Sequence, residues 1–261
     1  MRGKLIVLEG IDGSGKATQA HLLAQRLRQH GYRVRQADFP QYGRWSAAFV
    51  EKYLRGEWGT AQQVGPYAAA VCFAMDRLAS RDQLRKWLGA GDIVVSNRYV
   101  SASLAHQGAK IPDLKERGRV VQWIKDLEYG KLGIPKPDVT ILLKVPPEIG
   151  RLLVGKKPPR KHLRGKKRDI HEQDTAHLRA AEHAYMDLAR SEGWQMVECV
   201  WSGRMLPPQT IAELVWDKVR PALPEPQAPR QRRRKVRLPG RRLLRRKRGE
   251  QQKAVLEGPA T

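Results

Sequence analysis

The sequence predicts an α/β fold in which a five-stranded parallel sheet carries helices on both faces. Short runs rich in apolar residues alternate with longer helical patterns, the order typical of a parallel sheet with crossover helices. The runs at 93–96 and 138–145 are short, mostly apolar and bounded by turn residues, as in strands buried on both sides. With 261 residues, 41% of them hydrophobic, the chain is long enough for one large core. We expect strands at 5–8, 32–39, 93–96, 138–145 and 195–200.

Helical patterns occupy the intervals between these strands. The first ends at Gly31, which suits a left-handed cap, and Pro66 suits the first turn of a long apolar helix. An amphipathic pattern with Val120 and Ile124 on one side lies between the third and fourth strands. We expect helices at 16–30, 46–54, 66–88, 114–129, 147–153, 171–190 and 207–219.

A glycine-rich turn connects the first strand to the first helix and predicts a nucleotide phosphate site. Gly10, Gly13 and Gly15 permit left-handed backbone, so that successive N–H groups can surround an anion at a helix N-terminus. Lys16 follows, and the spacing fits seven of the eight positions of G-x-x-x-x-G-K-[ST]. The eighth position is Ala17, which lacks a hydroxyl for magnesium. The alternative is a plain glycine-rich turn, and the strand and helix that flank the motif as required favour the phosphate site.

The second strand ends in a turn that belongs to the same edge of the sheet. Phe39, Pro40, Tyr42 and Gly43 follow that strand, and loops at the carboxyl ends of parallel strands form binding sites. We therefore expect this turn to frame a ligand.

Charge divides the chain into a domain at 1–222 and a tail at 223–261. The net charge is +24, and twelve Lys and Arg residues lie between Arg230 and Arg248, after a proline-rich break. Such a composition builds no core, so we expect the tail to be disordered when free and to bind polyanions such as nucleic acid without specificity. The competing interpretations are a merely solvated appendage and a tail that folds back over the nucleotide site.

Cysteine content and hydropathy favour a cytoplasmic protein. Cys72 and Cys199 form no C-x-x-C pattern, which argues against a disulfide framework or a cysteine zinc site. The longest apolar run near the N-terminus, 5–8, is too short for a signal segment or a membrane span. We expect a reducing compartment and no membrane contact.

Five motifs in one order carry a resemblance to a known family. They are the glycine-rich turn, Phe39-Pro40-Gln41-Tyr42-Gly43, Phe73-Ala74-Met75-Asp76-Arg77, Asn97-Arg98-Tyr99 and Leu132-Gly133-Ile134-Pro135-Lys136-Pro137-Asp138. Together they resemble thymidylate kinase over residues 3 to about 220. The resemblance implies a P-loop kinase fold, a three-layer sandwich, and transfer of the ATP γ-phosphoryl group to dTMP. It implies ATP binding by Gly10, Ile11, Asp12, Gly13, Ser14, Gly15, Lys16, Ala17 and Thr18.

The resemblance also implies roles on the acceptor side. Phe73 would stack on thymine and Arg77 would donate to the base, since a flat ring and a fixed donor can read a pyrimidine. Arg98 would clamp the acceptor phosphate with its guanidinium fork. The implied substrate-binding set is Phe39, Pro40, Tyr42, Phe73, Arg77, Arg98, Ser103 and His106. From the residues alone, Phe73 is about as often a core residue, and His106 is better explained as a structural histidine than as a proton carrier.

Catalytic and metal residues are implied in the same way. Lys16, Arg98 and Asp12 would act on the phosphates, as would the basic segment at about 154–170, which matches the family's lid. That segment has eight Lys and Arg residues and no acid between 155 and 168, and we expect a mobile loop outside the core. Its candidates for the transferred group are Arg160, Arg164 and Arg168. Mg²⁺ would be held near Asp12, with Glu172 in reach through water.

Two departures from the family pattern concern the metal, and two alternatives stay open. Ala17 replaces a hydroxyl residue and Asn97 replaces an aspartate, so phosphates, water and Asp12 would hold most of the magnesium. The alternatives are a kinase for another nucleoside monophosphate and a non-catalytic nucleic-acid-binding protein. A homodimer is also expected, because 66–88 is apolar enough all round to be buried on two sides.

Overall fold

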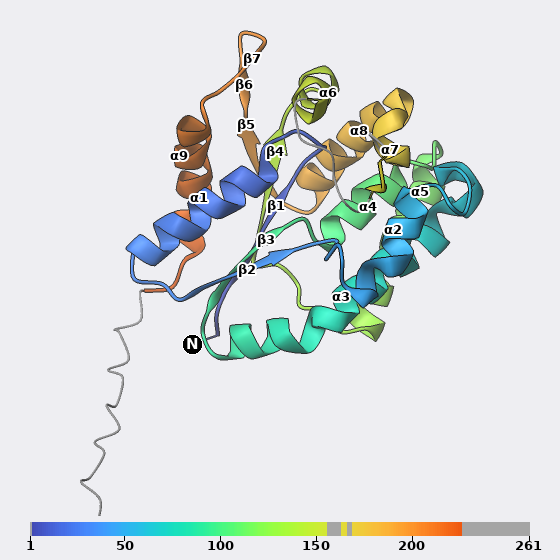
Figure 1. Cartoon of the computed structure of the whole chain (residues 1–261). Coiled ribbons are helices and arrows are strands. Elements are labelled where there is room, and N and C mark those ends of the chain that lie inside the picture. Colours follow the sequence, from blue (N-terminus) through green and yellow to red (C-terminus); the bar gives the residue numbers. More distant parts are fainter. Residues whose placement is uncertain (1, 156–162, 166–168, 226–261) are drawn as a thin grey trace, which may run out of the picture. The chain divides into compact units, whose positions relative to one another are not determined.

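A computed structural model describes residues 2–155, 163–165 and 169–225, without the side chains of residues 172 and 173 (Figure 1). Its central sheet has five parallel strands in the order β2-β3-β1-β4-β5, so that the first strand of the chain lies in the middle. The strands are β1 Leu5–Glu9, β2 Val34–Asp38, β3 Ile93–Asn97, β4 Val139–Lys144 and β5 Gln195–Glu198. The predicted sheet is confirmed, strand by strand.

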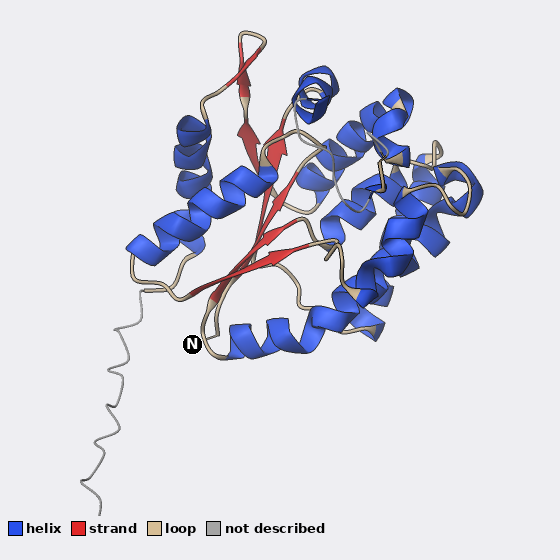
Figure 2. Cartoon of the chain, in the orientation of Figure 1, coloured by secondary structure: helices blue, strands red, loops and turns tan. Residues whose placement is uncertain are grey.

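Helices cover the sheet on both faces, as Figures 1 and 2 show. Because neighbouring side chains of a strand point to opposite faces, Leu5 and Val7 pack under one layer while Ile6 and Leu8 pack under the other. One layer contains α1 Lys16–Gln29 and α9 Pro208–Val219. The other contains α3 Ala61–Gly89, α4 Val100–Gly108, α5 Leu114–Lys125 and α8 Thr175–Ser191. The three-layer arrangement is therefore confirmed.

Shorter elements complete the described chain. They are the 3₁₀ turns η1 Trp45–Ala47 and η4 Arg220–Ala222, helices α2 Ala48–Leu54, α6 Pro147–Gly155 and α7 Ile170–Gln173, the π-helical turn η2 Asp126–Lys131, and the hairpin β6 Val200–Trp201 with β7 Arg204–Met205. The predicted helix at 171–190 is divided into α7 and α8. Asp174 makes the division, because its side chain accepts from the backbone N–H of His177 and caps α8.

The long helix α3 begins five residues before the predicted start at Pro66. Thr60 and Gln63 form a reciprocal capping box that starts the helix at Ala61. Gly65 then has φ 73°, a left-handed conformation that interrupts the helix, and Pro66 starts the second segment. The prediction that Pro66 lies in the first turn of a helix is confirmed, but that helix is the second of two segments joined at Gly65.

The basic segment and the tail fall mostly outside the described residues. Within 163–165, the Leu163 side chain is fully buried, so the expectation that no part of this segment enters the core was wrong at that position. The tail from 226 onward, with its twelve clustered basic residues, lies outside the described chain. Among residues 2–155, 163–165 and 169–225, no helix is both long and apolar enough to cross a bilayer.

Candidate active site

The glycine-rich turn has the predicted backbone. Gly10, Gly13 and Gly15 have φ of 142°, 87° and 86°, and Gly15 forms the N-cap of α1. A Cβ atom on Gly13 would lie 2.1 Å from the carbonyl oxygen of Gly150 in α6. The turn therefore requires glycine both for its dihedral angles and for its close approach to a neighbouring helix.

Lys16 lies over this turn with its side chain mostly buried. Its Nζ donates to the carbonyl oxygens of Gly10 and Ile11, at 2.9 and 2.7 Å. The same ammonium is 4.0 Å from a carboxylate oxygen of Asp12. Ala17 and Thr18 are exposed at the start of α1. The lysine is thus held at the mouth of the loop by oxygen atoms that phosphate oxygens can replace.

Arg98 follows β3 and reaches the same carboxylate from the opposite side. Its φ of 62° is left-handed, an uncommon conformation for a side chain of this size and a mark of functional positions. Nη2 donates to Asp12 at 2.6 Å, and Nη1 donates to the Tyr185 hydroxyl at 3.2 Å. Burial raises the pKa of Asp12, but the Arg98 and Lys16 charges outweigh it and hold that pKa well below its usual range. Asp12 is therefore ionised between two cations.

All eight predicted substrate-binding residues line one cavity, together with Asp12. Phe39 and Arg98 come from the carboxyl ends of neighbouring strands, Phe73 and Arg77 from α3, and Ser103 and His106 from α4. Tyr42 is 40% exposed at the rim, and Phe73 contacts the buried Tyr53 ring edge to face. A larger hollow of about 1030 Å³ lies at the amino ends of β4 and β5, and none of the predicted ATP-binding, substrate-binding, catalytic or metal residues lines it. The sequence-derived set thus meets in one place.

Arg77 is held more firmly than the resemblance implied. Its Nε and Nη2 donate to the two carboxylate oxygens of Glu128, both at 2.5 Å, and both side chains are almost fully buried. Nη2 also donates to Ser103 Oγ at 2.7 Å, and Nη1 donates to the carbonyl oxygen of Tyr99 at 3.3 Å. These bonds use four of the five guanidinium N–H groups. Within the described chain, one N–H on Nη1 is left for a ligand.

Comparison with known proteins agrees with this geometry. The family model described as thymidylate kinase matches residues 8–200. Thymidylate kinase of Mycobacterium tuberculosis H37Rv is 33% identical over 193 residues, covering 73% of this chain and 87% of the relative. That of Thermomicrobium roseum is 31% identical, covering 82% and 93%. The chain belongs to the thymidylate kinase family. The fold also resembles a solved Candida albicans thymidylate kinase, with a TM-score of 0.64, 19% identity and coverage of 84% and 92%.

The family membership confirms the resemblance inferred from the motifs, and with it the expectation of an ATP-dependent phosphotransferase. Sequence reasoning missed several residues that build the thymidylate kinase site. Glu9 is fully buried and accepts from the Tyr99 N–H, the Ser101 hydroxyl and the Tyr185 hydroxyl, at 2.8, 2.8 and 3.1 Å. The sequence did contain a signal for Glu9, since an acidic residue at the end of an aliphatic strand becomes buried and then needs several hydrogen-bond donors around it. Through Tyr185, Glu9 positions the guanidinium of Arg98.

Asp76 was quoted within a motif but given no role. Its buried carboxylate accepts from the backbone N–H of Gln41 at 2.8 Å and from the Ser46 hydroxyl at 2.6 Å. These bonds fix the turn after β2 against α3. The aspartate therefore positions the loop that carries Phe39 and Tyr42.

The predicted lid and metal residues are only partly described. Arg160 and Arg168, and the side chain of Glu172, lie outside the described residues; Arg164 is exposed with φ 47°. Asn97 donates to Asp38 Oδ1 at 2.9 Å, and its own Oδ1 is buried with no hydrogen-bond partner in the described chain. A buried amide oxygen beside a carboxylate, at the carboxyl ends of the neighbouring strands β3 and β2, fits the oxygen ligands of magnesium.

Proposed function

We propose that this chain transfers the γ-phosphoryl group of ATP to dTMP, giving dTDP and ADP. The observation that carries the proposal is that the donor and acceptor sides meet at one carboxylate. Asp12 Oδ1 lies 4.0 Å from Lys16 Nζ in the phosphate loop and 2.6 Å from Arg98 Nη2 in the acceptor cavity. Two phosphates bound on either side of Asp12 would be adjacent, which is the main requirement of phosphoryl transfer.

The two cations would exchange partners when the nucleotides bind. Lys16 would leave the carbonyl oxygens of its own loop for the outer phosphates of ATP, where it neutralises charge that develops in the transition state. Arg98 would turn part of its fork from Asp12 to the acceptor phosphate. Tyr185 keeps its bond to the same guanidinium, so the side chain stays aimed at the cavity.

The base would be bound between α3 and α4. Phe73 is half-buried and can offer a ring face to a pyrimidine. The remaining N–H of Arg77 is a donor suited to a carbonyl oxygen at position 4 of thymine. Because Glu128, Ser103 and Tyr99 fix the guanidinium, the donor cannot rotate away to suit an amino group.

Mg²⁺ would be held mainly by the phosphates and water, with Asp12 and the oxygens of Asp38 and Asn97 within the same edge of the sheet. When bound, the ion would supply positive charge to the phosphate oxygens. Asp38 adds a carboxylate to the proposed metal site that was not among the residues predicted from the motifs, Asp12 and Glu172. The basic lid would supply further cations through Arg160, Arg164 or Arg168.

Homodimer formation through α3 is part of the proposal. Tyr67, Val71 and Met75 follow one another at four-residue spacing on this helix and are 44%, 41% and 43% exposed. Exposed apolar rows of this kind favour a protein partner. Analytical ultracentrifugation of Val71→Glu against the parent chain tests it, since a charge in the row should favour the monomer.

The domain boundary, the cellular compartment and the binding of nucleic acid are proposed from the sequence alone. We propose a cytoplasmic enzyme domain at 1–222 followed by a basic appendage that binds nucleic acid through its charge. Ending the chain near Pro224 should leave dTMP turnover intact and remove nucleic-acid binding that weakens steeply with salt. Loss of turnover on truncation would instead favour a tail that helps catalysis.

A coupled assay of ADP release tests the central activity. The purified full chain is supplied with ATP, Mg²⁺ and each nucleoside monophosphate in turn. We expect turnover with dTMP, and a loss of about 10²-fold or more in Lys16→Ala at unchanged folding. Preference for another monophosphate would identify a different kinase. Absence of turnover with every monophosphate, combined with nucleic-acid binding, would favour a non-catalytic protein.

A further inference from the structure

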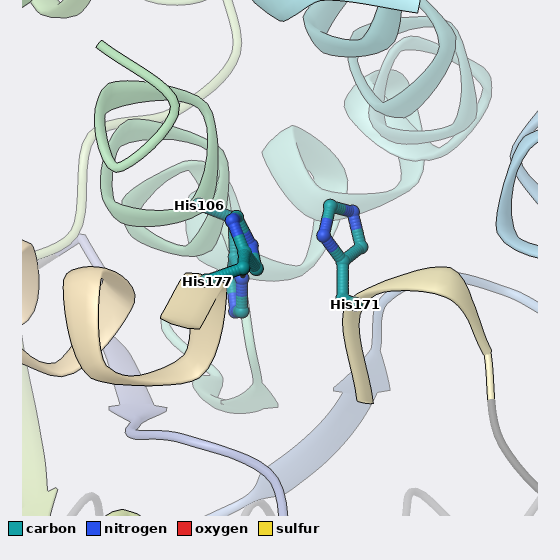
Figure 3. Close-up of side chains that lie close together, drawn as sticks. All are labelled: His106, His171 and His177. Carbon is teal, nitrogen blue, oxygen red and sulfur yellow. Dashed lines mark hydrogen bonds between the residues drawn. The ribbon is translucent and has the colours of Figure 1, made fainter. Parts of the chain in front are cut away.

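Three buried histidines on three different helices meet at the wall of the acceptor cavity. His106 lies on α4, His171 on α7 and His177 on α8, and each is at most 8% exposed. One ring nitrogen from each lies within 4.8 Å of the others. Figure 3 shows the His171 ring facing the other two. The phosphoryl transfer described above uses none of these nitrogens as an acid or a base.

The surroundings keep all three imidazoles neutral. Burial lowers the pKa of each ring, and nearby cations lower it further: Arg98 next to His106, and Lys110 near His171 and His177. For His177 the pKa falls to about 4. A neutral imidazole has one nitrogen with a free lone pair, which is the form that binds a metal ion.

The spacing of two of the rings already suits a tetrahedral ion. His106 Nδ1 and His177 Nε2 are 3.4 Å apart. Two nitrogens bound to zinc at about 2.0–2.1 Å in tetrahedral geometry lie about 3.3–3.4 Å from each other. The third nitrogen, at most 4.8 Å away, would have to approach by about 1.4 Å, a movement that rotation of one side chain can supply.

His171 offers that third nitrogen without losing a bond. Its Nδ1 is buried and finds no hydrogen-bond partner among the described residues. Its Nε2 lies 3.0 Å from the Tyr53 hydroxyl, and the same hydroxyl accepts from Lys110 Nζ at 2.9 Å. Metal-binding histidines commonly donate their second ring N–H to an oxygen, which fixes the tautomer. The Tyr53 oxygen stands in that position.

The cost of binding falls on two long contacts, because the 3.4 Å hydrogen bond between His106 Nδ1 and His177 Nε2 is lost when both nitrogens bind the ion, together with one contact to Arg98. If His106 binds through Nδ1, its proton moves to Nε2, and the 3.4 Å contact with Arg98 Nη1 is lost. Arg98 keeps its bonds to Asp12 and Tyr185. Asp169, whose carboxylate accepts from the backbone N–H of His171 at 2.9 Å, offsets part of the positive charge of the ion, whereas Asp12 is already paired with Arg98 and Lys16.

We propose that His106, His171 and His177 form a site for a single Zn²⁺ ion. Three imidazole ligands leave the fourth position open, and His106 and His171 both line the acceptor cavity, so that position faces it. A water molecule from the cavity completes the coordination. The proposal does not depend on which nucleotide the cavity accepts.

Direct metal binding tests the site. The full chain is stripped with a chelator and titrated with Zn²⁺ in competition with a chromophoric chelator, and in parallel with Co²⁺. We expect one ion per chain and the intense visible absorption of four-coordinate cobalt. His171→Gln and His177→Gln, with folding checked by circular dichroism, should each weaken Zn²⁺ binding at least hundredfold. Tyr53→Phe, which keeps all three ligands, should weaken it about 10- to 100-fold.

The matched control is His183→Gln. His183 is exposed on the same helix as His177 and should leave the binding unchanged. Equal Zn²⁺ affinity in the parent chain and in folded His171→Gln and His177→Gln would overturn the proposal. Should those variants not fold, the cobalt spectrum of the parent chain decides: a weak six-coordinate spectrum, or none, overturns it.

Discussion

Two arginines line the same cavity and both pair with a carboxylate, but their surroundings differ. Arg77 and Glu128 are 2% and 0% exposed and share two hydrogen bonds. Arg98 and Asp12 are 15% and 27% exposed and share one. The first pair is enclosed between α3 and the π-helical turn η2, whereas the second stands between the phosphate loop and the end of β3.

The difference indicates that Arg77 stabilises the cavity wall, whereas Arg98 can exchange its carboxylate partner for a phosphate. Breaking the buried pair would leave Glu128 charged and without compensation, so Arg77 is committed to the fold and has one N–H left for a base. Arg98 faces an accessible carboxylate that a phosphate can replace at little cost. The two arginines therefore serve different purposes, although both line one cavity and both pair with a carboxylate.

The largest effect is expected from breaking the buried pair. Arg77→Ala should lower the free energy of unfolding by roughly 3–5 kcal/mol, because the Glu128 carboxylate stays buried without its partner. Chemical denaturation measures this. Replacing both residues with apolar ones of similar size, as in Arg77→Met with Glu128→Leu, should recover most of the loss.

The control for that experiment is an exposed pair. Arg179 and Glu148 are 63% and 62% exposed, so Arg179→Ala should cost less than about 1 kcal/mol. If Arg77→Ala were no more destabilising than Arg179→Ala, the contrast between the two cavity arginines would fail.

Arg98→Ala should do the opposite, sparing the fold and removing activity. We expect kcat/KM for dTMP to fall about 10²- to 10³-fold, because the acceptor phosphate loses its principal cation. The free energy of unfolding should fall by clearly less than in Arg77→Ala, since the Arg98–Asp12 pair is more exposed and Asp12 keeps Lys16 nearby. Steady-state kinetics and denaturation on the same preparation check both statements. Retained turnover would assign the phosphate to another residue.

The choice among pyrimidine monophosphates tests whether Arg77 contacts the base. Its fixed N–H should accept dTMP and dUMP, which carry a carbonyl oxygen at position 4, and reject dCMP, which presents an amino group there. Leaving these groups unpaired should cost about 1–3 kcal/mol, or roughly 5- to 150-fold in kcat/KM. Rates with the three monophosphates provide the measurement, and equal turnover of dCMP would contradict the assignment.

The smallest effect is expected at the metal. Ala17→Ser combined with Asn97→Asp adds a hydroxyl ligand and a carboxylate beside Asp38, so the Mg²⁺ concentration giving half-maximal rate should fall a few-fold. A magnesium titration of the double variant against the parent chain tests this. An unchanged requirement would show that these positions do not govern the ion, although Arg98 and Arg77 would keep their roles.

Local signals explain what could be predicted. The strands, the glycine-rich turn and Arg98 lie in segments whose pattern is complete within a few residues, so sequence was sufficient to find them. Glu128 gave no such signal, because only the π-helical turn after α5 directs it inward toward Arg77.

Residues that meet from distant segments could not be predicted together. His106, His171 and His177 come from three helices, and no spacing along the chain indicates that their rings converge. The capping box at Thr60 and Gln63 is different: its two residues are local and could have placed the start of α3 from sequence.

The central claim, that Arg98 and not Arg77 holds the acceptor phosphate, is tested most directly by a binding cycle. Calorimetry would compare dTMP with thymidine, which lacks the phosphate, on the parent chain, Arg98→Ala and Arg77→Lys. The account predicts that Arg98→Ala reduces the preference for dTMP over thymidine by at least about tenfold, or about 1.4 kcal/mol. Arg77→Lys should weaken both ligands alike. An unchanged preference in Arg98→Ala, or an equal reduction in both variants, would contradict it.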